Sequence, residues 1–106
     1  MSRKIHKLDA ERTELAGFRD SRSYWTVTGK VYLFGRDMMR QREEVHARDA
    51  GKCVACGKVQ SLFEMELDHY PISRGQGGDD SMSNLRTLCF DCHRARHPQV
   101  QLRSMK

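Results

Sequence analysis

Residues 67–97 read LDHYPISRGQGGDDSMSNLRTLCFDCHRARH, and this stretch decides the fold together with CVACG at residues 53–57. A two-residue gap between cysteines lets both sulfurs of a pair reach one zinc ion at about 2.3 Å. Residues 57–88, which separate the two pairs, exceed the usual ribbon spacing and are long enough to hold a strand and a loop. We therefore predict a closed structural zinc site formed by two Cys-x-x-Cys pairs, Cys53, Cys56, Cys89 and Cys92.

The size of the chain also favours a metal site. With 106 residues, of which 38% are apolar, we expect one domain with a marginal core, and a small core is commonly supplemented by a disulfide or a metal. The charged first 20 residues predict no signal peptide, and no window is apolar enough for a transmembrane helix. We expect a cytoplasmic chain with reduced thiols, which favours zinc over a redox dithiol or an iron–sulfur cluster.

The net charge of +5 favours an anionic partner, with nucleic acid the first candidate and a solvated basic surface the alternative. Acidic residues are interleaved with the basic ones through most of the chain. Charge therefore leaves both interpretations open.

Four further residues form a second set: Asp68, His69, Asn84 and His93. Each alone is typical of a turn, a cap or a surface position. Together they fit phosphodiester hydrolysis, because a neutral imidazole can deprotonate water and a carboxylate with an imidazole can hold a divalent ion. Adjacent residues of a strand point to opposite faces, so Asp68 and His69 are expected to take different roles.

The N-terminal third of the chain predicts little regular structure. We expect residues 1–33 to form an irregular arm with a basic tail over Met1–Lys7. A short helix capped by Asp9 should stop near Gly17, and the β-branched and aromatic residues of Trp25–Leu33 indicate a strand or an extended segment.

Residues 34–50 predict a helix, with Gly51 placed as a C-terminal cap. The stripe through Phe34, Met38 and Val45 indicates its buried face. Its arginines could meet phosphates or form a solvated face with pairs such as Glu44 with Arg48. These arginines are Arg36, Arg40 and Arg48.

The remaining elements are short. Alternating apolar and acidic residues over Leu62–Asp68 predict a half-buried strand, and Pro71–Ser83 predicts a loop. A second strand is expected over Leu85–Leu88, followed by a helix that Asp91 caps and Pro98 ends or disrupts.

Residues 53–97 resemble the HNH endonuclease family, also called the His-metal finger, in its four-cysteine zinc-ribbon form. The matching features are an Asp-His pair, a glycine-rich loop ending in Asp, a Ser-Asn-Leu step and a Leu-Cys-x-x-Cys-His segment. The resemblance implies an α+β fold, a small ββα-metal finger held by the zinc ribbon. A helix should precede it, so we divide the chain into an arm at residues 1–33 and a nuclease domain at residues 34–106.

The resemblance also implies roles for individual residues. His69 would be the general base, and Asn84 would hold the loop and help to orient His69. Asp68 and His93 would be ligands of a catalytic divalent ion such as Mg²⁺, Mn²⁺, Ni²⁺ or Zn²⁺. His97 shares a helix face with His93, but Pro98 opposes a helical conformation there, so His97 is a candidate third ligand with a surface histidine as the alternative.

The implied activity is metal-dependent cleavage or nicking of DNA that leaves a 5′-phosphate and a 3′-hydroxyl. Two alternatives are a zinc-ribbon module that binds nucleic acid without cutting it, and a redox protein with reactive thiols. A protein partner for targeting, the oligomeric state and the pathway, whether phage packaging, restriction or repair, stay open. His6 and His46 are interpreted as structural or solvent-facing. Candidate contacts to DNA phosphates are Arg74, Arg86, Arg94 and Arg96.

Overall fold

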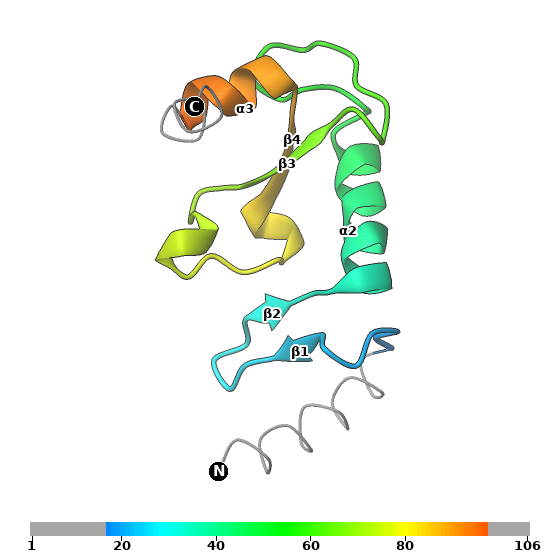
Figure 1. The fold of residues 1–106 in the computed structure, drawn as a ribbon, viewed down its shortest axis with the longest axis vertical. Helices are drawn as coiled ribbons and strands as arrows, with labels where there is room; N and C mark the ends of the chain where they lie inside the picture. Colours follow the sequence, from blue (N-terminus) through cyan, green and yellow to red (C-terminus); the bar gives the residue numbers. More distant parts are fainter. Residues whose placement is uncertain (1–16, 98–106) are drawn as a thin grey trace, which may run out of the picture.

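The computed structural model describes residues 17–97, and Figure 1 shows their arrangement. Among these residues, the hairpin at residues 24–32 lies at one end, helix α3 (Phe90–Arg96) lies at the other, and the long helix α2 (Gly35–Arg48) runs beside the central strands (Figure 1). The predicted basic tail, the Asp9 helix and His6 lie outside the described residues. In chain order the elements are β1 (Tyr24–Trp25), β2 (Val31–Tyr32), α2 (Gly35–Arg48), β3 (Glu66–His69), η1 (Arg74–Gln76), η2 (Met82–Asn84), β4 (Leu85–Leu88) and α3 (Phe90–Arg96).

The ββα unit consists of β3, β4 and α3. The two strands are antiparallel, with Asp68 opposite Arg86 and His69 opposite Leu85. Both α2 and α3 pack against this pair of strands. The α+β prediction is therefore confirmed, with a ββα arrangement compatible with a metal finger.

The predicted strand over Leu62–Asp68 is wrong in its first half. Ser61 and Glu64 exchange hydrogen bonds, in which the Ser61 N–H donates to Glu64 Oε1 at 3.0 Å and the Glu64 N–H donates to Ser61 Oγ at 3.1 Å. This pair of bonds closes a turn, so the strand begins only at Glu66. The alternation of apolar and acidic residues did not reveal the turn, and Phe63 is 85% exposed.

Helix α2 matches the prediction for residues 34–50 within two residues. Gly51 has φ +67°, and its N–H donates to the His46 carbonyl at 2.8 Å, as expected of a helix-ending glycine. Val45 is fully buried, whereas Phe34 and Met38 are half-buried. The pairing of Glu44 with Arg48, expected for a solvated face, is replaced by contacts of Arg48 with other residues.

Arg48 instead ties α2 to the ββα unit. Its guanidinium binds Asp49 at 2.9 Å and donates to the carbonyls of Met82 and Leu85, both at 2.7 Å. Leu85, whose carbonyl binds Arg48, also belongs to a core cluster with Val45 and Met65. Two backbone carbonyls and a carboxylate next in the chain satisfy the guanidinium better than a flexible exposed glutamate does.

The segment Trp25–Leu33, predicted as a short strand or an extended segment, belongs to a hairpin. Strands β1 and β2 pair antiparallel, and Gly29, with φ +89°, forms the turn between them. A positive φ is open to glycine, so this residue reverses the chain inside the β-branched stretch. The segment before β1 is anchored to α2 by the buried Asp37, whose carboxylate accepts hydrogen bonds from Arg19 N, Asp20 N and Ser23 Oγ.

Helix α3 begins two residues earlier than predicted. Its N-cap is Cys89, whose sulfur accepts from the Cys92 N–H at 3.4 Å, and Asp91 lies in the first turn instead of at the cap. The helix ends at Arg96, shortly before Pro98 as expected. Within residues 17–97, no helix is long and apolar enough to cross a bilayer.

Candidate metal centres and active site

The four cysteines come together at the end of the ββα unit near the start of α3. Their Sγ atoms all lie within 4.8 Å of one another, and Cys56 Sγ is 3.8 Å from Cys89 Sγ. All four are free thiols. A closed set of four sulfurs is the donor set that zinc prefers in structural sites, so the cluster fits the predicted metal.

The backbone brings the two pairs into register. Gly57, with φ +81°, closes the first knuckle by donating to the Cys53 carbonyl at 2.8 Å. The N–H of Val54 donates to the Thr87 carbonyl at 3.0 Å, which fixes the knuckle beside β4, and Cys89 directly follows β4. The hairpin of β3 and β4 therefore carries the second pair back to the first.

The cluster is built to hold negative charge at Cys53. Burial alone would raise the pKa of this thiol, but backbone N–H groups of Cys89, Cys56 and Ala55 that donate to its sulfur lower its pKa to about 6. A metal ligand must be the thiolate, so these N–H groups favour the binding form.

A second set of ligand atoms lies on one face of β3 where it meets α3. Asp68, His93 and His97 each offer a ligand atom within 4.8 Å of the others. The Asp68 Oδ1 atom is 3.7 Å from His93 Nε2 and 3.3 Å from His97 Nε2. One buried carboxylate and two half-buried imidazoles form a donor set that suits a divalent ion.

The position of His97 reconciles two opposing expectations. Its φ of −128° and ψ of 67° are not helical, as Pro98 was expected to require. Its N–H nevertheless still donates to the His93 carbonyl at 3.1 Å, which keeps the two side chains on one face. The imidazole rings lie 4.8 Å apart, centroid to centroid.

The electrostatics around Asp68 favour its charged form. Burial opposes ionisation, but hydrogen bonds from Arg86, His97 and Arg96 lower the pKa of the carboxyl. The pKa of His93 is lowered as well, because its burial outweighs the attraction of Asp68. A charged carboxylate beside a neutral imidazole is the state that binds a cation.

One neighbour of this set escaped the sequence reasoning. Glu66 lies two residues before Asp68, on the same face of β3, and its Oε1 atom is 3.6 Å from His93 Nδ1. The ring of His93 therefore lies between two carboxylates. The two-residue period of a strand, which places Glu66 and Asp68 on one face, was the available sequence signal for Glu66. The stretch alternates glutamates with apolar residues, so its composition does not distinguish Glu66 from Glu64.

His69 lies outside the three-residue set and contacts the loop instead. Its Nε2 atom is 2.6 Å from Asp80 Oδ1, and Asp80 is fully buried. Asp80 was not among the predicted site residues. The separation of Asp68 and His69 into different environments agrees with their expected placement on opposite faces of the strand.

Asn84 is buried and holds the loop between β3 and β4. Its side chain accepts from the Ile72 N–H at 2.9 Å and donates to the carbonyls of Ile72 and Asp79 at 2.8 and 3.0 Å. A Cβ at Gly78 would collide with the Ile72 carbonyl and with this amide, so the close approach requires glycine. Asn84 thus contacts the loop backbone, as expected of a residue that holds the loop. The side chain that contacts the ring nitrogen of His69 is Asp80 and not Asn84.

The predicted DNA contacts have different surroundings. Arg86 and Arg96 both bind Asp68, at 2.9 and 3.0 Å, and both stack on the ring of Tyr70. Arg74 is half-exposed and binds Asp80 at 3.1 Å, whereas Arg94 lies over Phe90. Contact of these four arginines with DNA phosphates stays a prediction. His46, interpreted as structural or solvent-facing, binds the Gln60 carbonyl at 2.7 Å.

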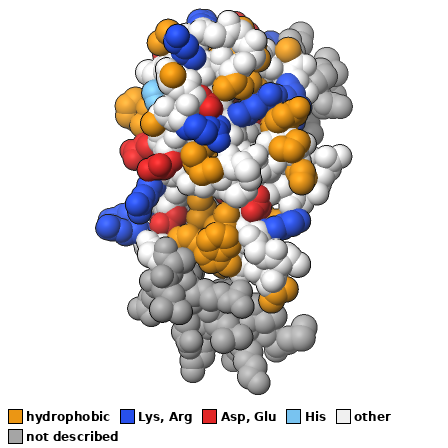
Figure 2. All heavy atoms as spheres, turned by 180° about the vertical axis from the view of Figure 1, so that it is seen from behind, with side chains coloured by type: hydrophobic (Ala, Val, Ile, Leu, Met, Phe, Trp, Pro, Cys, Tyr) orange, Lys and Arg blue, Asp and Glu red, His pale blue; other side chains and the backbone are white. Residues whose placement is uncertain are grey.

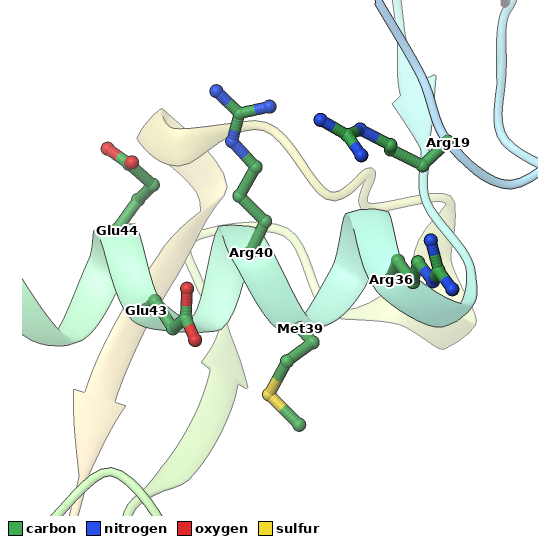
Figure 3. Close-up of a pocket in the computed structure, with 6 residues that line it drawn as sticks. All are labelled: Arg19, Arg36, Met39, Arg40, Glu43 and Glu44. Atoms are coloured by element: carbon green, nitrogen blue, oxygen red, sulfur yellow. The ribbon is translucent and has the colours of Figure 1, made fainter.

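The outer face of α2 carries a surface hollow of mixed charge. Arg36, Met39, Arg40, Glu43 and Glu44 line it from the helix, and Figure 3 shows Arg40 and Glu44 projecting on the same side. Arg19 also lines it, from the segment before β1 (Figure 3). The face opposite to that of Figure 1 likewise mixes acidic and basic side chains (Figure 2). This mixture favours the solvated face over a phosphate-binding stripe along the helix.

The fold and the two ligand clusters are compatible with a ββα-metal protein that carries a four-cysteine metal site. The sequence model of the HNH endonuclease family matches residues 53–99, the segment that contains both clusters. This match to an HNH endonuclease domain indicates a nuclease-type function. No curated protein and no solved structure matches the chain.

Proposed function

We propose that the protein is a metal-dependent DNA endonuclease that hydrolyses or nicks phosphodiester bonds. The observation that carries the proposal is the Asp68, His93 and His97 set, with His69 next to it on the other side of the strand end, within the HNH segment. A divalent ion held by this set would act as a Lewis acid on the phosphate and the leaving oxygen.

In this proposal His69 removes a proton from the attacking water. A neutral imidazole can do so near neutral pH, and general-base catalysis typically contributes about 10²- to 10⁴-fold to the rate. Asp68 and the two histidines of α3 hold the ion, and the cysteines hold structural zinc. Arg94 is the most available of the four arginines for phosphates, because Arg86 and Arg96 already bind Asp68 and Arg74 binds Asp80.

The test is cleavage of supercoiled plasmid with Mg²⁺, Mn²⁺, Ni²⁺ or Zn²⁺ added to the zinc-loaded chain. We expect nicked or linear products from the wild type and a loss of about 10²-fold or more in His69→Ala. His46→Gln is the matched control, because His46 lies on α2 outside both clusters, and it should cut like the wild type. Equal products from the wild type and His69→Ala, at matched purity, contradict the catalytic role.

The metal content separates cleavage from simple binding. A zinc-ribbon module without activity should hold one zinc ion per chain and gain no second divalent ion. The proposed nuclease should take up a second ion that His93→Ala removes while the cysteine-bound zinc stays. Mapping the cut ends tests the expected 5′-phosphate and 3′-hydroxyl.

A further inference from the structure

Asp80 is a carboxylate near the proposed active site that has partners on both of its oxygens. It is fully buried, and Oδ1 is 2.6 Å from His69 Nε2. Oδ2 accepts the backbone N–H of Leu33 at 2.9 Å and the guanidinium of Arg74 at 3.1 Å. A buried carboxylate with a partner on each oxygen has little freedom to turn.

These contacts favour one nitrogen of His69 as the carrier of the proton. The N–H of Leu33 and the guanidinium of Arg74 can only donate to Asp80. With Asp80 as the acceptor of all three contacts, a neutral His69 donates through Nε2 and keeps its lone pair on Nδ1. The contact therefore selects one tautomer of the ring, as a carboxylate does for a histidine in other catalytic sites.

The backbone around Asp80 is held by strand β2 of the N-terminal hairpin. The Asp80 N–H donates to the Val31 carbonyl at 2.8 Å, and the Val31 N–H donates to Asp79 Oδ2 at 2.9 Å. Lys30 Nζ and Tyr32 Oη both donate to the Gly77 carbonyl at 3.2 Å. Figure 1 shows the loop between β3 and β4 lying beside this hairpin.

We propose that Asp80, fixed by β2, is a positioning residue that sets the orientation and tautomer of His69. The strand that fixes it lies outside residues 53–99, so a segment beyond the HNH match completes the active site. The inference rests on the proposed function for the role of His69 as base. The tautomer itself is a property of the folded protein and does not depend on any activity.

Asp80→Asn tests the proposal through the nitrogen NMR signals of His69 in the full-length, zinc-loaded chain. In the wild type we expect the proton on Nε2. An asparagine has one acceptor oxygen and one donor amide, and the Leu33 N–H needs the oxygen. The amide would then face His69 and reverse the tautomer, so that the proton moves to Nδ1.

Asp79→Asn is the matched control, because the neighbouring carboxylate also binds β2 but does not touch His69. Its oxygens accept from the Val31 N–H and from the Ser81 hydroxyl, and the hydroxyl can turn to accept from an amide. We expect Asp79→Asn to keep the wild-type tautomer. The backbone amide spectrum of each variant reports whether its fold is retained.

Cleavage provides the second readout. We expect Asp80→Asn to lose about 10- to 100-fold in kcat with the KM for plasmid little changed, and Asp79→Asn to stay within a few-fold of the wild type. A proton on Nδ1 in the wild type overturns the proposal even if the Asp80 variant does not fold. An unchanged tautomer in a folded Asp80→Asn protein also overturns it. A wild type that carries the expected tautomer but cuts no DNA would refute the proposed function and leave the positioning contact standing.

Discussion

Asp68→Asn should lower stability even when no divalent ion is added, because Asp68 is the shared acceptor of a cationic cluster. The carboxylate is 1% exposed and receives Arg86 Nε at 2.9 Å and Arg96 Nε at 3.0 Å. An asparagine keeps the shape, but it removes the charge and one of the two acceptors. Both guanidinium groups then lose their counter-charge at an otherwise unchanged site.

The size of the loss follows from these two bonds. A hydrogen bond to a charged group contributes about 1.5–3 kcal/mol. The arginine side chains are 25% and 28% exposed, so each regains part of its hydration when the bond is lost. We therefore expect a net loss of about 2–3 kcal/mol in the free energy of unfolding, which is less than the sum of two full bonds.

Urea unfolding of the zinc-loaded chain measures this loss. With a slope of about 1–3 kcal/mol per molar urea, the midpoint should fall by roughly 1–2 M. Glu66→Gln is the matched control, since it neutralises a carboxylate on the same face of β3 whose side chain is 38% exposed. Its effect should stay below about 0.5 kcal/mol. Equal midpoints for Asp68→Asn and Glu66→Gln would refute the assignment of Asp68 as the centre of the cluster.

Three other perturbations give separate outcomes. Cys92→Ser should lose the cysteine-bound zinc, measured by metal analysis, and with it the dispersed amide spectrum of the fold, because this core cannot replace the metal. His97→Ala should weaken uptake of the second divalent ion by about 10-fold or more in calorimetry while the zinc content stays at one, whereas unchanged uptake would remove His97 from the ligand set. Asp37→Asn should destabilise the chain by about 2 kcal/mol at neutral pH, because one amide cannot accept all three bonds from the segment before β1. Burial opposes ionisation of Asp37, but these three bonds lower its pKa below the unfolded value of about 3.9. The contribution of Asp37 to stability is therefore complete above that pH and is lost as the pH falls through the folded pKa. The acid unfolding curves of the wild type and of Asp37→Asn should converge in this range.

The elements that depend on local chemistry could be predicted. Helix α2 and strand β4 were expected nearly as they occur, because an apolar stripe with a terminal glycine, and a short segment with a leucine at each end, are local signals. The hairpin at residues 24–32 and the turn before Glu66 were missed for the opposite reason. In both places a few polar hydrogen bonds interrupt a stretch whose composition favours a strand.

The candidate site also contains residues that local sequence signals predicted and contacts that they did not predict. The cysteine quartet and the spacing of His93 and His97 were readable, because two-residue knuckles and the helix period act over a few residues. The role of Asp68 as a shared acceptor of two arginines was not predicted from the sequence. Its partners Arg86 and Arg96 were expected to contact phosphates, and their distance from Asp68 in the chain hides the contact.

By itself the sequence predicted the candidate metal ligands of this protein, which are the four cysteines for zinc and Asp68, His93 and His97 for a divalent ion. The tertiary structure decided which carboxylate touches His69. Asp79 and Asp80 are adjacent in a glycine-rich loop, and nothing local distinguishes them. Only the fold brings Leu33 of the N-terminal segment against Asp80, and the fixed direction of that backbone N–H turns the other oxygen toward His69.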